Sequence, residues 1–295
     1  MNYVEVDKDN SGNPIKISYN DYGKGKPIIL IHGWPLSSEM WEYQISGLVE
    51  SGHRVIAYDR RGFGKSSQPW NGYDYDTLTD DLKALIEFLH LEDITLVGFS
   101  MGGGEVARYF SRYNGKGVTK VVLISAITPY MLKTESNPEG IPQEVFDEMV
   151  EKIKEDRIGF LDDFGRTFFG VSFMNNPLSP PLLEYYRALC SVASPRATIE
   201  CARAFTTTDF REEMRLIHVP TLLIHGDADK TVPLDSTSKQ SAKLILVNNF
   251  IIYEGEPHGL FYTQRERLTA DLLEFITNED ISLYQEAHTL DELVK

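Results

Sequence analysis

Residues 94–110 read ITLVGFSMGGGEVARYF. The apolar run 94–97 is typical of a buried strand, and from residue 103 onward apolar side chains recur at helical spacing. Between them lies a G-x-S-x-G pentapeptide centred on Ser100. A serine in a sharp strand-to-helix turn is exposed to substrate beside a helix N-terminus, and its small neighbours relieve crowding in the strained turn. The pentapeptide alone is common in plain turns, but this context predicts that Ser100 is a nucleophile.

Apolar runs of the same kind recur along the chain and alternate with helical patterns. The runs cover residues 27–31, 54–58, 94–97, 121–124, 221–224 and 250–253, and helical patterns cover 40–51, 75–89, 105–113, 236–242 and 264–277. Segments 4–6 and 15–22 predict an opening antiparallel hairpin. Continuous apolar runs suit strands that are buried on both faces. The alternation therefore predicts an α/β fold with a mostly parallel central sheet and helices on both faces.

One segment interrupts the alternation and predicts the domain organisation. Residues 128–210 contain no strand pattern, are interrupted by prolines and are rich in aromatic residues. We expect a helical cap insertion over the carboxyl edge of the sheet, where ligands of open α/β sheets bind. Most of its aromatic rings should fill its own core, with a few facing a pocket. The core would then be residues 1–127 and 211–277, followed by a tail or short helix at 278–295.

Composition limits the class of protein. The chain has 295 residues, 42% hydrophobic and 25% charged, as in ordinary globular proteins. A net charge of −15 argues against a nucleic-acid partner and against anionic membrane surfaces. No apolar stretch approaches 18 residues and the N-terminus has no leader pattern, so we expect no membrane span and a cytoplasmic location. Cys190 and Cys201 are expected to be neutral, buried thiols.

A serine nucleophile needs a histidine base, which in turn needs a carboxylate to fix its tautomer. Among the seven histidines, His258 lies in a loop after the last strand and before the last helix, where the order Ser, acid, His requires the base. His32 and His225 each end a strand before a glycine, which favours structural roles. Both Asp227 and Asp229 follow the run 221–224. We assign Asp229 to the triad and Asp227 to the turn, where such side chains often cap their own backbone.

The oxyanion of an acyl-transfer reaction needs two backbone donors. One should be the N–H of Met101, directly after the nucleophile, and the other that of Trp34, in the loop after the run 27–31. Pro35 restricts Trp34 to extended backbone and so fixes its carbonyl, which could hold water or hydrogen peroxide near the acyl carbon. Trp34, Phe99 and Met101 predict a compact aromatic acyl pocket that suits short acyl groups, and Pro35 is placed beside it.

Several motifs together resemble the α/β-hydrolase superfamily. They are HGWP at residues 32–35 with Trp41 and Gln44, YDRRGFGKS at 58–66, GFSMGGGE at 98–105, GDAD at 226–229 and PHG at 257–259. Within the superfamily the chain looks like the cofactor-free (non-haem) chloroperoxidases and bromoperoxidases, also called perhydrolases and aryl esterases, from about residue 19 to 276. The resemblance implies a Ser100–Asp229–His258 triad, Trp34 and Met101 as oxyanion donors, and no metal, haem or other cofactor. The chain also contains no H-E-x-x-H motif and no Cys/His cluster.

The expected reaction is hydrolysis of small carboxylic esters through an acyl-serine. By resemblance, hydrogen peroxide in place of water would give a peracid, which oxidises bromide or chloride. The partners would be a small ester or acid, with hydrogen peroxide and halide, and the family resemblance implies a homo-trimer or hexamer. Hydrolysis of γ-lactams, other amides or carbon–carbon bonds by the same triad is an alternative, as is a non-catalytic ligand receptor. Dehalogenases and epoxide hydrolases would require an aspartate at position 100.

Overall fold

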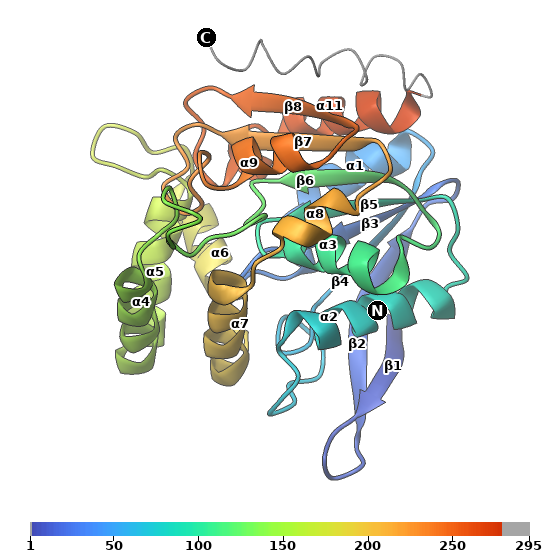
Figure 1. The fold of residues 1–295 in the computed structure, drawn as a ribbon. Coiled ribbons are helices and arrows are strands. Elements are labelled where there is room, and N and C mark those ends of the chain that lie inside the picture. Colours follow the sequence, from blue (N-terminus) through green and yellow to red (C-terminus); the bar gives the residue numbers. More distant parts are fainter. Residues whose placement is uncertain (1, 279–295) are drawn as a thin grey trace.

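The computed structural model describes residues 2–278 and contains one eight-stranded sheet (Figure 1). The strand order is β1-β2-β4-β3-β5-β6-β7-β8, in which β1/β2 and β2/β4 pair antiparallel and all other neighbours pair parallel. The strands are β1 (Asn2–Lys8), β2 (Pro14–Tyr22), β3 (Pro27–Ile31), β4 (Arg54–Tyr58), β5 (Ile94–Phe99), β6 (Val118–Ile124), β7 (Thr221–Gly226) and β8 (Asn248–Tyr253).

The apolar runs predicted as strands are buried on both faces. Successive side chains of a strand point to opposite faces, so Ile28 and Leu30 join one apolar cluster while Ile29 and Ile31 join another. The helices α2 (Tyr75–Phe88) and α3 (Gly102–Tyr113) contribute to the second cluster, and α1 (Glu42–Glu50) and α11 (Arg265–Thr277) contribute to the first. The mostly parallel sheet with a helical layer on each face confirms the predicted fold class.

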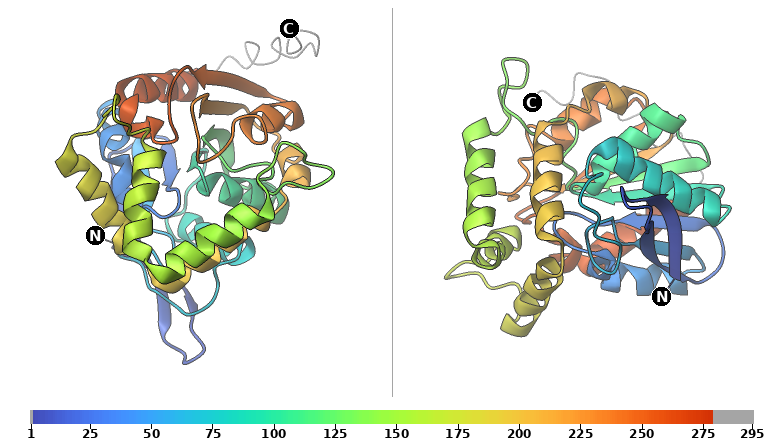
Figure 2. Two further views of the ribbon diagram at one scale, coloured as in Figure 1. Left: turned by 90° about the vertical axis from the view of Figure 1, so that its left-hand side faces the viewer. Right: turned by 90° about the horizontal axis from the view of Figure 1, so that it is seen from below.

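The chain between β6 and β7 is mainly helical. It contains α4 (Gln143–Glu155), α5 (Arg157–Phe168), α6 (Pro180–Ser191), α7 (Pro195–Thr207) and the short α8 (Arg211–Arg215). Figures 1 and 2 show α4–α7 standing to one side of the sheet, while α8 lies against the core. The cavity described below is lined both by these helices and by Ser100 at the end of β5, which places α4 and α5 over the carboxyl ends of the strands.

The observed elements differ from the sequence pattern mainly at their ends. Strand β6 begins at Val118, earlier than the apolar run, because Val118 and Lys120 pair with Ile94 and Thr95 of β5. Helix α9 (Ser238–Leu244) begins two residues later than predicted, because the hydroxyl of Thr237 donates to the Pro233 carbonyl and closes a separate turn. The predicted tail or helix at 278–295 lies outside the described residues, apart from Asn278.

Candidate active site

Ser100 occupies the turn between β5 and α3, and its backbone is left-handed with φ +53°. Its N–H donates to the Ile124 carbonyl at 2.9 Å, which ties the turn to β6. The flanking glycines are required by close approach, since a Cβ on Gly98 would lie 2.7 Å from the Gly102 carbonyl oxygen. A Cβ on Gly102 would lie 2.8 Å from the carbonyl oxygen of Ile31. The strained turn thus holds the serine against β3 with little freedom to move.

The structure brings Ser100, His258 and Asp229 together from three separate loops. His258 lies just before the short helix α10 (Leu260–Thr263), and its Nε2 is 2.9 Å from the Ser100 Oγ. Its Nδ1 is 2.6 Å from the Asp229 Oδ2. All three side chains are buried, and the rings of Phe99 and Phe168 pack on the imidazole with centroid distances of 5.0 and 4.7 Å. These contacts fix both the tautomer and the plane of His258.

The carboxylate of Asp229 is held by backbone as well as by His258. Its Oδ1 accepts from the N–H groups of Thr231 and Val232, each at 2.8 Å. Burial alone would raise the pKa of Asp229, but the charges and hydrogen bonds of His258 and His225 outweigh it and hold the pKa far below its usual range. The group is therefore a persistent anion beneath His258.

Asp227 takes a different position. It accepts a hydrogen bond from the Gly255 N–H at 2.6 Å, near the surface. This bond joins the turn after β7 to the loop that carries His258, so Asp227 braces the loops while Asp229 contacts the imidazole.

The residues expected to supply the two oxyanion donors belong to segments that lie beside Ser100. Met101 follows Ser100 directly, and the Gly33–Trp34 loop after β3 packs against Ser100, because a Cβ on Gly33 would lie 3.1 Å from the Ser100 Cβ. Within residues 2–278 the backbone N–H groups of Trp34 and Met101 donate to no protein acceptor. The Trp34 indole N–H donates to the Thr198 carbonyl at 2.9 Å, which anchors this loop to α7.

A buried ionic network behind this loop was not identified from the sequence. Glu105, in the first turn of α3, accepts from Arg60 Nε at 2.6 Å and from the Tyr58 hydroxyl at 2.5 Å. Arg60 also donates to the His32 carbonyl at 2.7 Å, and its backbone N–H donates to the His32 Nε2 at 2.9 Å. Burial and the Arg60 charge hold the pKa of His32 well below its usual value. The network thus links the nucleophile helix to the oxyanion loop.

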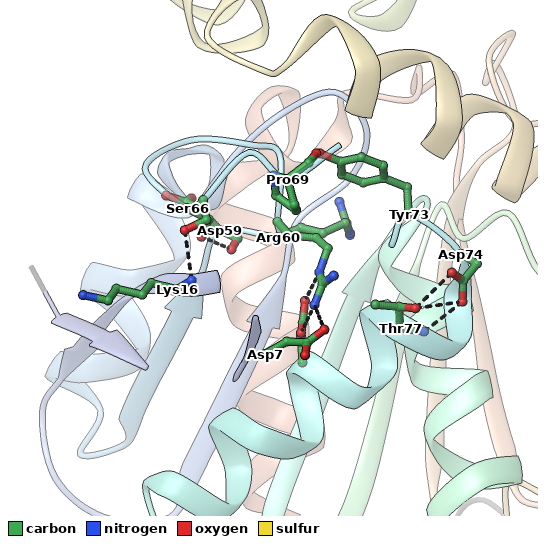
Figure 3. Close-up of polar contacts among 12 residues, drawn as sticks. Asp7, Lys16, Asp59, Arg60, Ser66, Pro69, Tyr73, Asp74 and Thr77 are labelled. Atoms are coloured by element: carbon green, nitrogen blue, oxygen red, sulfur yellow. Dashed lines mark hydrogen bonds and ion pairs between the residues drawn. The ribbon is translucent and has the colours of Figure 1, made fainter. Parts of the chain in front are cut away.

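The loop between β4 and α2 holds Arg60 in place and is itself braced locally (Figure 3). Asp59 accepts from the N–H groups of Ser38 and Lys65, each at 2.8 Å. Asp74 caps the start of α2 by accepting from the Thr77 N–H at 2.9 Å. Asp59 thus caps turns within this region, whereas the Arg60 side chain reaches α3 and pairs with Glu105.

A cavity of about 610 Å³ opens at Ser100. Its walls are mainly apolar, and charged side chains of α4, α5 and the loop after Asp229 are also present. It is lined by Trp34, Ser100, Ile127, Met131, Ile141, Val145, Phe146, Met149, Lys152, Glu155, Asp156, Gly159, Phe160, Asp163, Phe164, Thr167, Phe205, Lys230, Thr231 and Val232. This volume lies within the usual range for small-molecule sites and is far larger than an acetyl group needs.

The structure corrects the expected pocket residues. Phe99 is fully buried behind His258, because side chains alternate along β5 and its ring faces Trp41 and Phe261 instead of the cavity. Pro35, which follows a cis peptide bond, lines a separate narrow gap beside Leu36. Aromatic residues of the inserted helices take the expected place: Phe160 and Phe164 pack against Trp34 on the cavity wall.

Comparison with known proteins agrees with this architecture. A sequence profile of the alpha/beta hydrolase fold matches residues 26–264. The chain belongs to the α/β-hydrolase family. This α/β-hydrolase is 40% identical over 264 residues to a non-heme chloroperoxidase of Kitasatospora aureofaciens, covering 89% of this chain and 96% of that one. It is 41% identical over 265 residues to a bifunctional esterase/perhydrolase of Acinetobacter calcoaceticus, covering 89% and 96%.

A solved structure is also similar. The crystal structure of a bromoperoxidase from Bacillus anthracis superposes with a TM-score of 0.90 at 45% sequence identity, covering 94% of this chain and 99% of that one. Among residues 2–278, no group of three or more His, Cys, Asp or Glu side chains is arranged to hold a metal ion. No helix in the same range is long and apolar enough to cross a membrane. Cys190 and Cys201 are both buried, and burial raises the pKa of each thiol to about 12.

Proposed function

We propose that this α/β-hydrolase is a serine esterase with perhydrolase activity, in which Ser100, His258 and Asp229 form the catalytic triad. The observation that carries the proposal is the continuous chain Ser100 Oγ–His258 Nε2 at 2.9 Å and His258 Nδ1–Asp229 Oδ2 at 2.6 Å, beside a substrate-sized cavity. The relatives described as a chloroperoxidase and as an esterase/perhydrolase support the same chemistry.

The reaction runs in two halves. His258 accepts the Ser100 proton as the Oγ attacks the ester carbonyl, and the Trp34 and Met101 N–H groups stabilise the oxyanion. His258 then gives that proton to the leaving alcohol, which leaves an acyl-serine. Water, with His258 again as base, releases the acid and restores Ser100. Asp229 stabilises the His258 imidazolium throughout and keeps its negative charge.

Hydrogen peroxide can replace water in the second half. His258 accepts a proton from one peroxide oxygen, and that same oxygen attacks the acyl carbon. The bond to the Ser100 Oγ then breaks, His258 returns the proton to the Oγ, and the product is a peracid in place of the acid. The free peracid then transfers an oxygen atom to bromide or chloride, which is oxidised to hypohalous acid while the carboxylic acid is regenerated. The halide step takes place in solution, so peroxide and halide are reactants and the protein supplies only acyl transfer.

The substrates are expected to be small esters whose acid or alcohol part is apolar, because Trp34, Phe160 and Phe164 form the wall beside Ser100. We assign residues 128–210 to a cap over the residues 1–127 and 211–277 of the core, since the cavity is lined from both. A cytoplasmic location and a homo-trimer or hexamer are part of the proposal. Light scattering after size-exclusion chromatography tests the oligomeric state.

The first test is steady-state hydrolysis of p-nitrophenyl acetate by wild type and Ser100→Ala at neutral pH. Loss of the nucleophile should lower kcat by about 10⁴-fold or more. Addition of acetate, peroxide and bromide with a brominatable dye should then give bromination that also depends on Ser100. A wild-type rate equal to that of Ser100→Ala would overturn the triad. Turnover of a γ-lactam with only trace ester hydrolysis would point to the amide-hydrolase alternative.

A further inference from the structure

A second histidine, besides His258, approaches the carboxylate of Asp229. His225 is at the end of β7 and is fully buried. Its Nε2 lies 3.2 Å from the Asp229 Oδ2 and 2.9 Å from the Val232 carbonyl oxygen. Its Nδ1 lies 2.7 Å from the hydroxyl oxygen of Ser238, in the first turn of α9. Two imidazoles therefore converge on one carboxylate oxygen.

The surroundings of His225 define its tautomer. A neutral imidazole carries one N–H and one acceptor nitrogen. Its Nε2 faces two oxygens that can only accept, the Val232 carbonyl and the Asp229 carboxylate, so Nε2 must carry the hydrogen. Its Nδ1 is then the acceptor for the Ser238 hydroxyl. The resulting chain of donors runs from Ser238 through His225 to Asp229, where it meets the chain from Ser100 through His258.

We propose that His225 is a positioning residue of the triad, whose Nε2–H donates to the Val232 carbonyl at 2.9 Å and also faces the Asp229 Oδ2 at 3.2 Å, and which so keeps this carboxylate oriented and ionised beneath His258. The inference rests on the proposed esterase function. His225 lies four residues before Asp229 at the end of a strand, and this sequence position is compatible with a purely structural role. Only the tertiary contacts of His225 indicate that it positions Asp229.

The donor from His225 completes the set around Asp229. Oδ1 accepts from the backbone N–H groups of Thr231 and Val232, while Oδ2 lies 2.6 Å from the His258 Nδ1 and 3.2 Å from the His225 Nε2. Every donor favours the charged form, which agrees with the strongly lowered pKa of Asp229. When His258 becomes an imidazolium during the reaction, a carboxylate held by three hydrogen bonds and the close N–H of His225 does not take its proton. It stabilises the cation and holds the ring in place for the return of that proton to the leaving group.

The removal of this donor has a defined effect on the pH profile. The titratable groups that face Asp229 are His258, from the loop before α10, and His225, from β7. Without the Nε2–H, more negative charge stays on Oδ2, so the imidazolium form of His258 is better stabilised. The acid limb of kcat/KM should move to higher pH. A looser carboxylate also orients His258 less well, and kcat should fall.

The experiment compares three variants and one matched control variant with wild type. His225→Met removes the donor with similar volume, whereas His225→Gln places an amide N–H near the position of the ring Nε2. Ser238→Ala removes the hydroxyl that fixes the tautomer and is a small truncation that should fold. Ser241→Ala is the matched control, because it deletes a buried hydroxyl from the same helix that donates to the Thr128 carbonyl at 2.9 Å. Hydrolysis of p-nitrophenyl acetate is measured from pH 5 to 9.

We expect His225→Met to lower kcat by roughly 10- to 100-fold, as for other groups that orient a catalytic ligand, with KM changed less than about twofold. Its acid limb should move up by roughly half a pH unit or more. His225→Gln should retain most of the wild-type kcat and the wild-type position of the acid limb. Ser238→Ala should show the same two changes as His225→Met, but smaller. Ser241→Ala should behave as wild type.

The proposed role of His225 would be overturned if His225→Met had the kcat and the pH profile of wild type. It would also be overturned if His225→Met and His225→Gln lost kcat equally while the acid limb did not move. If His225→Met does not fold, Ser238→Ala decides the question by the same two readouts. Failure of the proposed function is distinguishable, because wild type would then show no hydrolysis that depends on Ser100. Failure of the role of His225 leaves that hydrolysis intact.

Discussion

Replacement of Glu105 by glutamine tests the buried ionic network most directly. Glu105 and Arg60 are almost wholly buried, with 0% and 1% of their surface exposed. In Glu105→Gln the guanidinium of Arg60 loses its counter-ion in the protein interior but keeps the neutral His32 carbonyl at 2.7 Å. Breaking a buried pair in this way costs about 3–5 kcal/mol, since one charge is left uncompensated. The glutamine amide keeps one oxygen that can accept from the Arg60 Nε, so we expect a cost at the lower end of this range.

The free energy of unfolding measured by urea titration should therefore fall by about 3 kcal/mol, and Tm by roughly 6–12 °C. The matched control is Glu87→Gln, which removes an exposed pair with Lys83 at 2.7 Å, one helical turn away. Exposed pairs of this type contribute about 0.3–0.5 kcal/mol, so the control should change little. A loss in Glu105→Gln no larger than in Glu87→Gln would refute the reasoning, because it would mean that the buried charge needs no counter-ion.

Kinetics give a second readout of the same variant. Arg60 connects Glu105 to the His32 carbonyl, two residues before Trp34. If the network orients the oxyanion loop, the folded fraction of Glu105→Gln should show a lower kcat, with KM nearly unchanged, because the Trp34 N–H acts mainly on the transition state. If kcat is unchanged in the folded variant, the network contributes to the stability of the fold and not to the orientation of the oxyanion loop.

Three further predictions follow from the same geometry. Gly104→Ala should lower the free energy of unfolding by about 1–3 kcal/mol in urea titration, because the added Cβ would lie 2.5 Å from the Tyr75 ring; a neutral effect would mean that the ring moves away freely. In a series of p-nitrophenyl esters, kcat/KM should rise about fourfold per methylene from acetate to hexanoate, since the cavity of about 610 Å³ buries the added groups; a maximum at acetate would contradict this. The lowered pKa of Asp229 means that its ionised form stabilises the fold fully above its unfolded pKa of about 3.9, and that this contribution is lost as pH falls from there toward the folded pKa. The stability difference between wild type and Asp229→Asn should therefore stay constant from pH 7 to about pH 5, begin to shrink near pH 4 and shrink further as the pH falls toward the folded pKa. A difference that stays constant below about pH 3 would argue against the shift.

Local sequence patterns were enough to predict the class of fold. The run 27–31 and its counterparts are apolar at every position, which is required of strands buried on both faces, and helical periodicity between them leaves few topologies other than a mostly parallel sheet. The turn at Ser100 could also be anticipated, because only small residues fit where Gly98 and Gly102 approach neighbouring backbone. These features depend on residues close together in the chain, so they can be read along it.

The assignment of Asp229 and His258 used chain order and loop position, and the structure places His258 against Ser100 and Asp229 against His258. Their distances could not come from the sequence, since they depend on how three loops end at one sheet edge. The pocket expectation failed at Phe99 for a related reason. Its neighbour Ser100 faces the cavity, but alternation along β5 turns the phenyl ring behind His258.

The sequence by itself determined the succession of strands and helices, the strained serine turn and the order of the triad residues, because short-range periodicity and backbone sterics encode them. Only the tertiary structure decided which charged groups are buried together. Glu105 and Arg60 are 45 residues apart, and His225 looks like an ordinary strand-end histidine until Asp229 and Ser238 are folded around it. The burial of a charge and the tautomer of an imidazole depend on partners brought together by packing, and no local pattern specifies those partners.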